Sequence, residues 1–183
     1  MNRIDTSIII STYNSTEWLE KVLHGYNNQT YRLFEIVIAD DGSNQKTLDL
    51  IKKIQKEVFY PIVHVWHEDN GFQKSQILNK AIEKCSTPYI IMSDGDCIPR
   101  FDFVEVHVKH RKQGLFLSGG YFMLPMNISD LISKEDIYEG NCFNLKWLKS
   151  NGCPFGKIRF KDQILKSKIV YDWLLSNDCP WDI

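Results

Sequence analysis

The chain has 183 residues, of which 43% are hydrophobic and 25% are charged. This length suits one well-packed domain that can bury roughly 70% of its unfolded surface, so folding requires no disulfide or metal. The 22 basic and 23 acidic side chains exclude a global positive field for nucleic acid, and the ordinary composition excludes a disordered chain, a collagen and a coiled coil.

Apolar runs and helical stripes alternate along the first 118 residues. Short apolar or β-branched runs predict strands at 7–11, 34–39, 62–66, 89–93 and 115–118. Between them, apolar side chains at the 3.6-residue period predict helices that follow Asn14 or Ser15, follow Ser43 or Asn44, run through 71–85 and cover 102–113. Such uniformly apolar strands indicate an α/β fold whose mostly parallel sheet carries helices on both faces.

The pattern is less regular beyond residue 119. A short apolar run makes 122–124 a further candidate strand, and 151–156 have the composition of a loop. Mixed helical stripes recur at 134–150 and 161–175. We find no repeat, no low-complexity tract and no obvious interdomain linker in the sequence.

Polar residues follow the predicted strands at their carboxyl ends, where open α/β sheets bind their ligands. The strongest cluster is Asp94-Gly95-Asp96, directly after the fourth strand. Two carboxylates on one turn suit Mg²⁺ or Mn²⁺ bound with a diphosphate, since these ions take one or two protein carboxylates and complete their shell with phosphate oxygens. A plain surface turn is the alternative, because Asp and Gly are common turn residues.

A second acidic cluster, Asp-Asp-Gly-Ser at 40–43, follows the second strand. Asp41 is placed to accept hydrogen bonds from a base N–H or a ribose hydroxyl. The alternative is that the cluster only starts the next helix, with Ser43 or Asn44 as its cap and the aspartates near its positive end. Capping explains Ser43, but it does not require two adjacent aspartates.

Three further features have both a functional and a structural interpretation. The hydroxyl and aromatic groups at 11–14 suit a nucleobase, although a helix entry explains them as well. Lys74 is a cation near the start of the third helix that can neutralise a phosphate, or it is simply solvated. Asn79 borders the apolar stripe of that helix, where a structural hydrogen bond is the alternative role.

The five cysteines are odd in number and widely spaced, without a C-x-x-C pair. This favours free thiols in a reducing compartment over a disulfide framework or a zinc site, so we expect a cytoplasmic protein. No segment approaches the ~18 apolar residues of a membrane span. Peripheral attachment at the inner face of a membrane stays compatible with the sequence. The five scattered histidines are interpreted as structural or surface residues.

Taken together, the strand-end clusters resemble the family 2 glycosyltransferases of the GT-A fold. The matching segments are SIIISTYNS at 7–15, IVIADDGS at 36–43, NGFQKSQILNKAI at 70–82 and YIIMSDGDCIP at 89–99. The last segment looks most like the bacterial polysaccharide and capsule branch, which includes chondroitin-synthase-like enzymes. The resemblance implies a Rossmann-like GT-A fold, with a nucleotide-diphosphate sugar bound at the carboxyl ends of the strands.

The resemblance also assigns roles to individual residues. It implies that Ser11 and Tyr13 line the nucleoside, that Asp41 hydrogen-bonds the base, and that Asp94 lies near the ribose. Asp96, with Asp94, would hold the Mn²⁺ or Mg²⁺ that bridges the diphosphate. The full expected nucleotide-sugar site consists of Ser11, Thr12, Tyr13, Asp41, Lys74, Asn79, Asp94 and Gly95.

The sequence departs from the family pattern in two places. Leu78 stands where many members have Arg, which leaves Lys74 as the candidate phosphate contact on this helix. The family also continues into an acceptor half that carries the catalytic base, whereas this sequence stops at CPWDI. We therefore expect 1–125 to be the nucleotide-sugar-binding half, 126–183 to be the beginning of an acceptor region, and the base to lie beyond Ile183.

The resulting hypothesis is an inverting glycosyltransferase that moves a sugar from a nucleotide-diphosphate donor, a UDP-sugar, to a saccharide acceptor in surface polysaccharide synthesis. A haloacid-dehalogenase-like phosphatase is one alternative, with Asp94 as nucleophile and Asp96 as acid and base. A nucleotide-sugar-binding module without transfer chemistry is the other. An absent acceptor half would also expose apolar side chains near Phe122, Met123, Trp147 and Trp173, which favours self-association.

Overall fold

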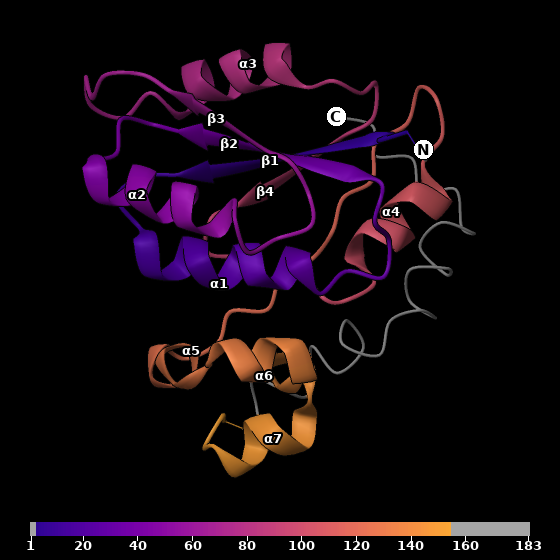
Figure 1. The fold of residues 1–183 in the computed structure, drawn as a ribbon. Helices are drawn as coiled ribbons and strands as arrows, with labels where there is room; N and C mark the ends of the chain where they lie inside the picture. Colours follow the sequence, from indigo (N-terminus) through magenta and orange to yellow (C-terminus); the bar gives the residue numbers. More distant parts are fainter. Residues whose placement is uncertain (1–2, 155–183) are drawn as a thin grey trace, which may run out of the picture. The chain divides into compact units, whose positions relative to one another are not determined.

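Four parallel strands form the sheet on which the first part of the chain is built (Figure 1). The structure, a computed structural model, describes residues 3–154. The strands are β1 (Thr6–Thr12), β2 (Phe34–Asp40), β3 (Ile62–Trp66) and β4 (Ile90–Asp94), in the spatial order β3-β2-β1-β4. The first four predicted strands and the parallel α/β fold are thereby confirmed.

Helices cover both faces of this sheet because its central strands are apolar on both sides. The helices are α1 (Thr16–Asn27), α2 (Gln45–Ile54), α3 (Lys74–Lys84) and α4 (Phe103–His110). Ile8 and Ile10 face a core built with α1, α2 and α4, whereas Ile9 faces α3, and all three isoleucines are completely buried. Figure 1 shows α3 on one face of the sheet and α1 with α2 on the other.

The order of the strands places a switch point between β1 and β4. The chain runs outward from β1 to β2 and β3, and then returns to the other side of β1 to form β4. Ser11, near the end of β1, pairs in register with Ala39 of β2 and Asp94 of β4. Ligands of open α/β sheets bind at such a point, outside the carboxyl ends of the strands.

Two predicted strands are wrong, because neither 115–118 nor 122–124 forms a strand. Leu115 and Phe116 are largely exposed, and β4 is an edge of the sheet with no further partner among residues 3–154. Strand preference depends strongly on an available neighbour, and these short apolar runs have none.

A second compact unit begins at Ser118, after a first unit that ends at Leu117. Its described elements are α5 (Met126–Leu131), α6 (Lys134–Glu139), the 3₁₀ helix η1 (Asn141–Phe143) and α7 (Leu145–Ser150). The predicted helical stretch 134–150 is thus divided at Gly140, and 161–175 lie outside the described residues.

Part of the apolar surface expected in this region is covered within the second unit itself. Phe122 and Trp147 pack against a small core of Ile128, Leu148 and Cys153, whereas Met123 is largely exposed. Trp173 lies outside the described residues. Within residues 3–154, no helix is long and apolar enough to cross a membrane.

Candidate functional site

A cavity of about 490 Å³ opens where the strands β1, β2 and β4 end. Its walls include eight of the residues expected from the sequence: Ser11, Thr12, Tyr13, Asp41, Lys74, Asp94, Gly95 and Asp96. Asn79 is not among them, because it lies exposed further along α3. The structure therefore brings the four strand-end clusters together in one hollow, without Asn79.

Asp94 lies at the centre of the switch point. Its Oδ1 accepts hydrogen bonds from Ser11 Oγ at 2.8 Å and from Lys74 Nζ at 2.6 Å. The hydrogen bond from the Lys74 ammonium, helped by the one from Ser11, lowers the pKa of the Asp94 carboxyl. Lys74 thus pairs with a carboxylate inside the cavity, rather than being only solvated.

Gly95 allows the ends of β1 and β4 to approach closely. Its N–H donates to Ser11 O at 2.8 Å, and a Cβ on this residue would lie 2.8 Å from that same oxygen. Such a contact with backbone cannot be relieved by rotating a side chain. A glycine between the two aspartates is therefore needed for the cavity floor to form.

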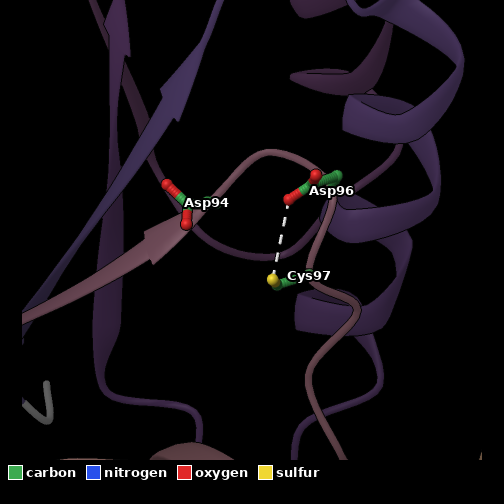
Figure 2. Close-up of side chains that lie close together, drawn as sticks. All are labelled: Asp94, Asp96 and Cys97. Carbon is green, nitrogen blue, oxygen red and sulfur yellow. Dashed lines mark hydrogen bonds between the residues drawn. The ribbon is translucent and has the colours of Figure 1, made fainter. Parts of the chain in front are cut away.

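Asp94, Asp96 and Cys97 offer a set of metal ligands on the turn after β4 (Figure 2). One ligand atom from each lies within 4.8 Å of the others, and both carboxylates are exposed. Cys97 Sγ donates to Asp96 Oδ1 at 3.6 Å, and burial, reinforced by Asp96, raises the pKa of the Cys97 thiol to about 11. The two exposed carboxylates supply oxygen ligands of the kind that Mg²⁺ and Mn²⁺ prefer.

Asp41 is held firmly at the end of β2. His67 Nε2 lies 2.7 Å from its Oδ1, and the backbone N–H of Gln73 donates to its Oδ2 at 2.9 Å. Lys80 Nζ lies 3.3 Å from His67 Nδ1. An ammonium can only donate, so this contact leaves the His67 proton on Nε2, facing Asp41. The carboxylate keeps lone pairs for a ligand while its orientation is fixed.

The neighbouring Asp40 has a structural role. It is almost completely buried, accepts from the backbone N–H of Ser43 at 2.8 Å and lies 2.8 Å from His64 Nε2. The two adjacent aspartates therefore have different roles. Asp40 stabilises the loop after β2, and Asp41 lines the cavity. His64 and His67 agree with the expectation of structural histidines, although the sequence did not reveal that each supports an aspartate.

Asn14 and Ser43 join the loops after β1 and β2. The N–H of Asn14 donates to Ser43 Oγ at 2.8 Å, and the N–H of Asn44 donates to Asn14 Oδ1 at 2.9 Å. Asn44, not Ser43, caps α2 by accepting from Lys46 N. Ser15 occupies the N-cap position of α1 without a side-chain cap bond.

Sequence reasoning assigned no role to Asp69 and Phe72 in the loop before α3, although both line the cavity. Tyr13 OH donates to Asp69 Oδ2 at 2.8 Å, and this hydrogen bond raises the pKa of Tyr13. The ring of Phe72 is 89% exposed. The sequence held no specific signal for either residue, because a single exposed apolar ring is common on protein surfaces.

Comparisons with known proteins agree with this geometry. A family model described as glycosyl transferase family 2 matches residues 7–122. Among curated relatives, chondroitin synthase of Pasteurella multocida is 32% identical over 98 residues, which cover 53% of this chain and 10% of that protein. The dolichyl N-acetyl-α-D-glucosaminyl phosphate 3-β-D-2,3-diacetamido-2,3-dideoxy-β-D-glucuronosyltransferase of Methanococcus voltae is 30% identical over 105 residues, which cover 56% and 32% of the two chains.

Solved structures show the same fold. The crystal structure of Staphylococcus aureus TarS, residues 1–349, in complex with UDP matches with a TM-score of 0.51 at 18% identity, over 66% of this chain and 40% of that one. The chain spans about a third or less of the length of the two curated relatives described above. The phosphatase alternative is not favoured, since the family match covers all four strand-end clusters.

Proposed function

The chain belongs to glycosyl transferase family 2, and on that basis we propose that it transfers a sugar from a nucleotide-diphosphate donor to an acceptor hydroxyl. The observation that carries the proposal is the shared cavity, in which Asp41 and the Asp94–Asp96 turn lie on opposite sides of the end of β1. These are two separate acidic positions, one for hydrogen-bonding a nucleoside and one for a metal–diphosphate.

The proposed donor is a UDP-sugar. The fixed carboxylate of Asp41 would accept from the N–H of the base, and Tyr13 would supply a half-exposed ring beside it. Lys74 would donate to a phosphate oxygen, because it lines the cavity and its Nζ lies beside Asp94. Asp94 and Asp96 would hold Mn²⁺ or Mg²⁺, which when bound offsets the negative charge of the leaving diphosphate.

The proposed reaction inverts the anomeric centre. The acceptor oxygen attacks the anomeric carbon from the face opposite the diphosphate, the bond from carbon to phosphate oxygen breaks with its electron pair, and a base removes the hydroxyl proton. Lys74 stabilises the departing diphosphate through a charge-assisted hydrogen bond. We assign no base among the described residues.

We further propose a saccharide acceptor and a role in surface polysaccharide synthesis, which the name of the Pasteurella relative supports. The proposed location is the cytoplasm, at the inner face of the membrane. Among the described residues Cys85, Cys97 and Cys142 are free thiols, which supports the proposed reducing compartment.

The experiment is a donor screen with the purified chain. Thermal stability is measured with Mn²⁺ and each of UDP-glucose, UDP-N-acetylglucosamine, UDP-glucuronic acid and GDP-mannose, and UDP release is then followed with oligosaccharide acceptors. We expect UDP-sugars to raise the melting temperature more than GDP-mannose does. Absence of stabilisation by every donor would contradict the proposal. Donor binding without UDP release would favour the nucleotide-sugar-binding module. Turnover of p-nitrophenyl phosphate would favour the phosphatase.

A further inference from the structure

The turn after β4 carries a sulfur ligand beside its two carboxylates. Cys97 follows Asp96 directly, and Figure 2 shows its sulfur hydrogen-bonded to the Asp96 carboxylate, across from Asp94 at the end of β4. The thiol is only partly buried, so a solvated ion can reach it. Cys142 and Cys153, in contrast, are buried in the second unit.

We propose that Cys97 is a third protein ligand of the cation held by Asp94 and Asp96, and that its sulfur gives this centre a preference for thiophilic divalent cations over Mg²⁺. Thiolate ligands favour Zn²⁺ and other soft or borderline cations, whereas carboxylates and water suit Mg²⁺. The inference rests on the proposed function only in assuming a cation at the two aspartates.

The separation of the ligand atoms suits one ion. Two ligand atoms that each lie about 2.0–2.3 Å from one cation are at most about 4.6 Å apart. The three atoms already lie within 4.8 Å of one another. Asp94 and Asp96 are both exposed, so the proposal requires their side chains to turn only slightly toward the ion.

Each of the three side chains has a ligand atom that binding can use. Both hydrogen bonds that Asp94 accepts go to Oδ1, and within the described part of the chain Oδ2 accepts none. Cys97 and Asp96 now share a hydrogen bond. On metal binding the S–H bond breaks, the proton passes to the solvent, and the sulfur lone pair forms the bond to the cation.

The test uses cobalt as a spectroscopic probe. Co²⁺ is titrated into the purified chain without nucleotide, and the near-ultraviolet thiolate-to-cobalt charge-transfer band is recorded for the parent, Cys97→Ser, Asp96→Asn and Cys85→Ser. Serine keeps a hydroxyl that can hydrogen-bond Asp96, while Cys85, partly exposed at the end of α3, is the matched control. We expect the band in the parent and in Cys85→Ser, and its loss in the other two variants.

Metal preference gives a second measurement. Cys97→Ser should lose Cd²⁺ affinity by at least the roughly 10–100-fold that removal of an outer-shell partner costs, with Mg²⁺ affinity nearly unchanged. A third measurement needs no variant: Cd²⁺ should slow alkylation of Cys97 by iodoacetamide, read by peptide mass spectrometry, without slowing alkylation of Cys85.

A parent without the band, or a Cys97→Ser variant that retains it, would overturn the inference, as would equal alkylation of Cys97 with and without Cd²⁺. These failures are separable from failure of the proposed function. Donor binding with Mn²⁺ but no cobalt band refutes the Cys97 ligand alone. A cobalt band without any donor binding refutes the glycosyltransferase alone.

Discussion

Lys74 contacts a protein carboxylate, and in the proposed function it would also contact a donor phosphate. Its ammonium lies 2.6 Å from Asp94 Oδ1, and the side chain is 40% exposed to the cavity and solvent. An exposed ion pair of this kind contributes little to stability. The ion pair instead positions the Lys74 ammonium, because it keeps a positive charge at the point where a diphosphate would meet the Asp94–Asp96 turn.

Replacing this lysine should separate phosphate binding from nucleoside binding. We expect Lys74→Met to weaken UDP binding roughly tenfold, because a charge-assisted hydrogen bond to phosphate is lost. Binding of uridine, which has no phosphate, should change little. Calorimetric titration of both ligands measures this, with Lys84→Met at the exposed end of the same helix as control. Equal weakening of UDP and uridine would show that Lys74 does not act through phosphate.

Two strands meet the cavity at a contact that only glycine permits. We expect Gly95→Ala to destabilise the protein by about 1–3 kcal/mol, since its Cβ would press on the carbonyl oxygen of Ser11 in β1. UDP binding should weaken at the same time, because the ends of β1 and β4 separate. Urea unfolding and UDP titration measure the two effects.

Gly119→Ala is the matched control for this substitution, because a Cβ there meets nothing within 4 Å. It should leave both stability and UDP binding unchanged. An unaltered unfolding curve for Gly95→Ala would mean that the strand ends tolerate more separation than the structure indicates.

Helix α4 packs a neutral histidine against the sheet. His107 is 7% exposed, stacks edge-on against Phe103 with ring centres 4.7 Å apart, and lies 3.2 Å from Tyr89 OH through Nδ1. Burial lowers the pKa of His107 to about 4, from an ordinary value of 6.5. Between these values the unfolded chain binds the proton and the folded chain does not.

Stability from His107 is therefore fully present above about pH 6.5 and is lost as the pH falls toward about 4. Lowering the pH from about 7 to about 5 should therefore reduce the parent's free energy of unfolding by roughly 1–2 kcal/mol through His107. His107→Gln should remove that part of the pH dependence. Urea unfolding at both pH values measures this effect. His110→Gln, which removes a second imidazole from α4, is the control. Equal pH dependence in the parent and His107→Gln would refute the assignment.

At the scale of the whole molecule, the sequence predicts those elements of the fold that are defined by a pattern of neighbouring residues. Apolar runs such as Ile8–Ile10 identify buried central strands, and their polar ends locate the cavity. The strands expected at 115–118 and 122–124 were not predictable, because a strand depends on a neighbour that the local sequence does not specify.

The site was predictable to the same degree. Asp41 and Asp96 could be expected to lie near one another because the carboxyl ends of parallel strands meet at one edge of the sheet, and the structure places both, with Lys74, in the cavity. Asp69, Phe72 and the support of Asp41 by His67 were missed, since they depend on contacts between loops far apart in the sequence. Asn79 borders a buried stripe in the sequence, yet the turn of α3 places it in solvent.

The central claim is that two acidic positions divide the donor between them: Asp41 receives the nucleoside, and Asp96 receives the metal–diphosphate. Calorimetric titration of UDP in Mn²⁺ and in EDTA, for the parent, Asp96→Ala and Asp41→Ala, tests it most directly. We predict that Mn²⁺ tightens binding by the parent, that Asp96→Ala binds equally in Mn²⁺ and EDTA, and that Asp41→Ala weakens binding in both conditions. Equal binding by the parent with and without Mn²⁺, or parent-like binding by both variants, would contradict the account.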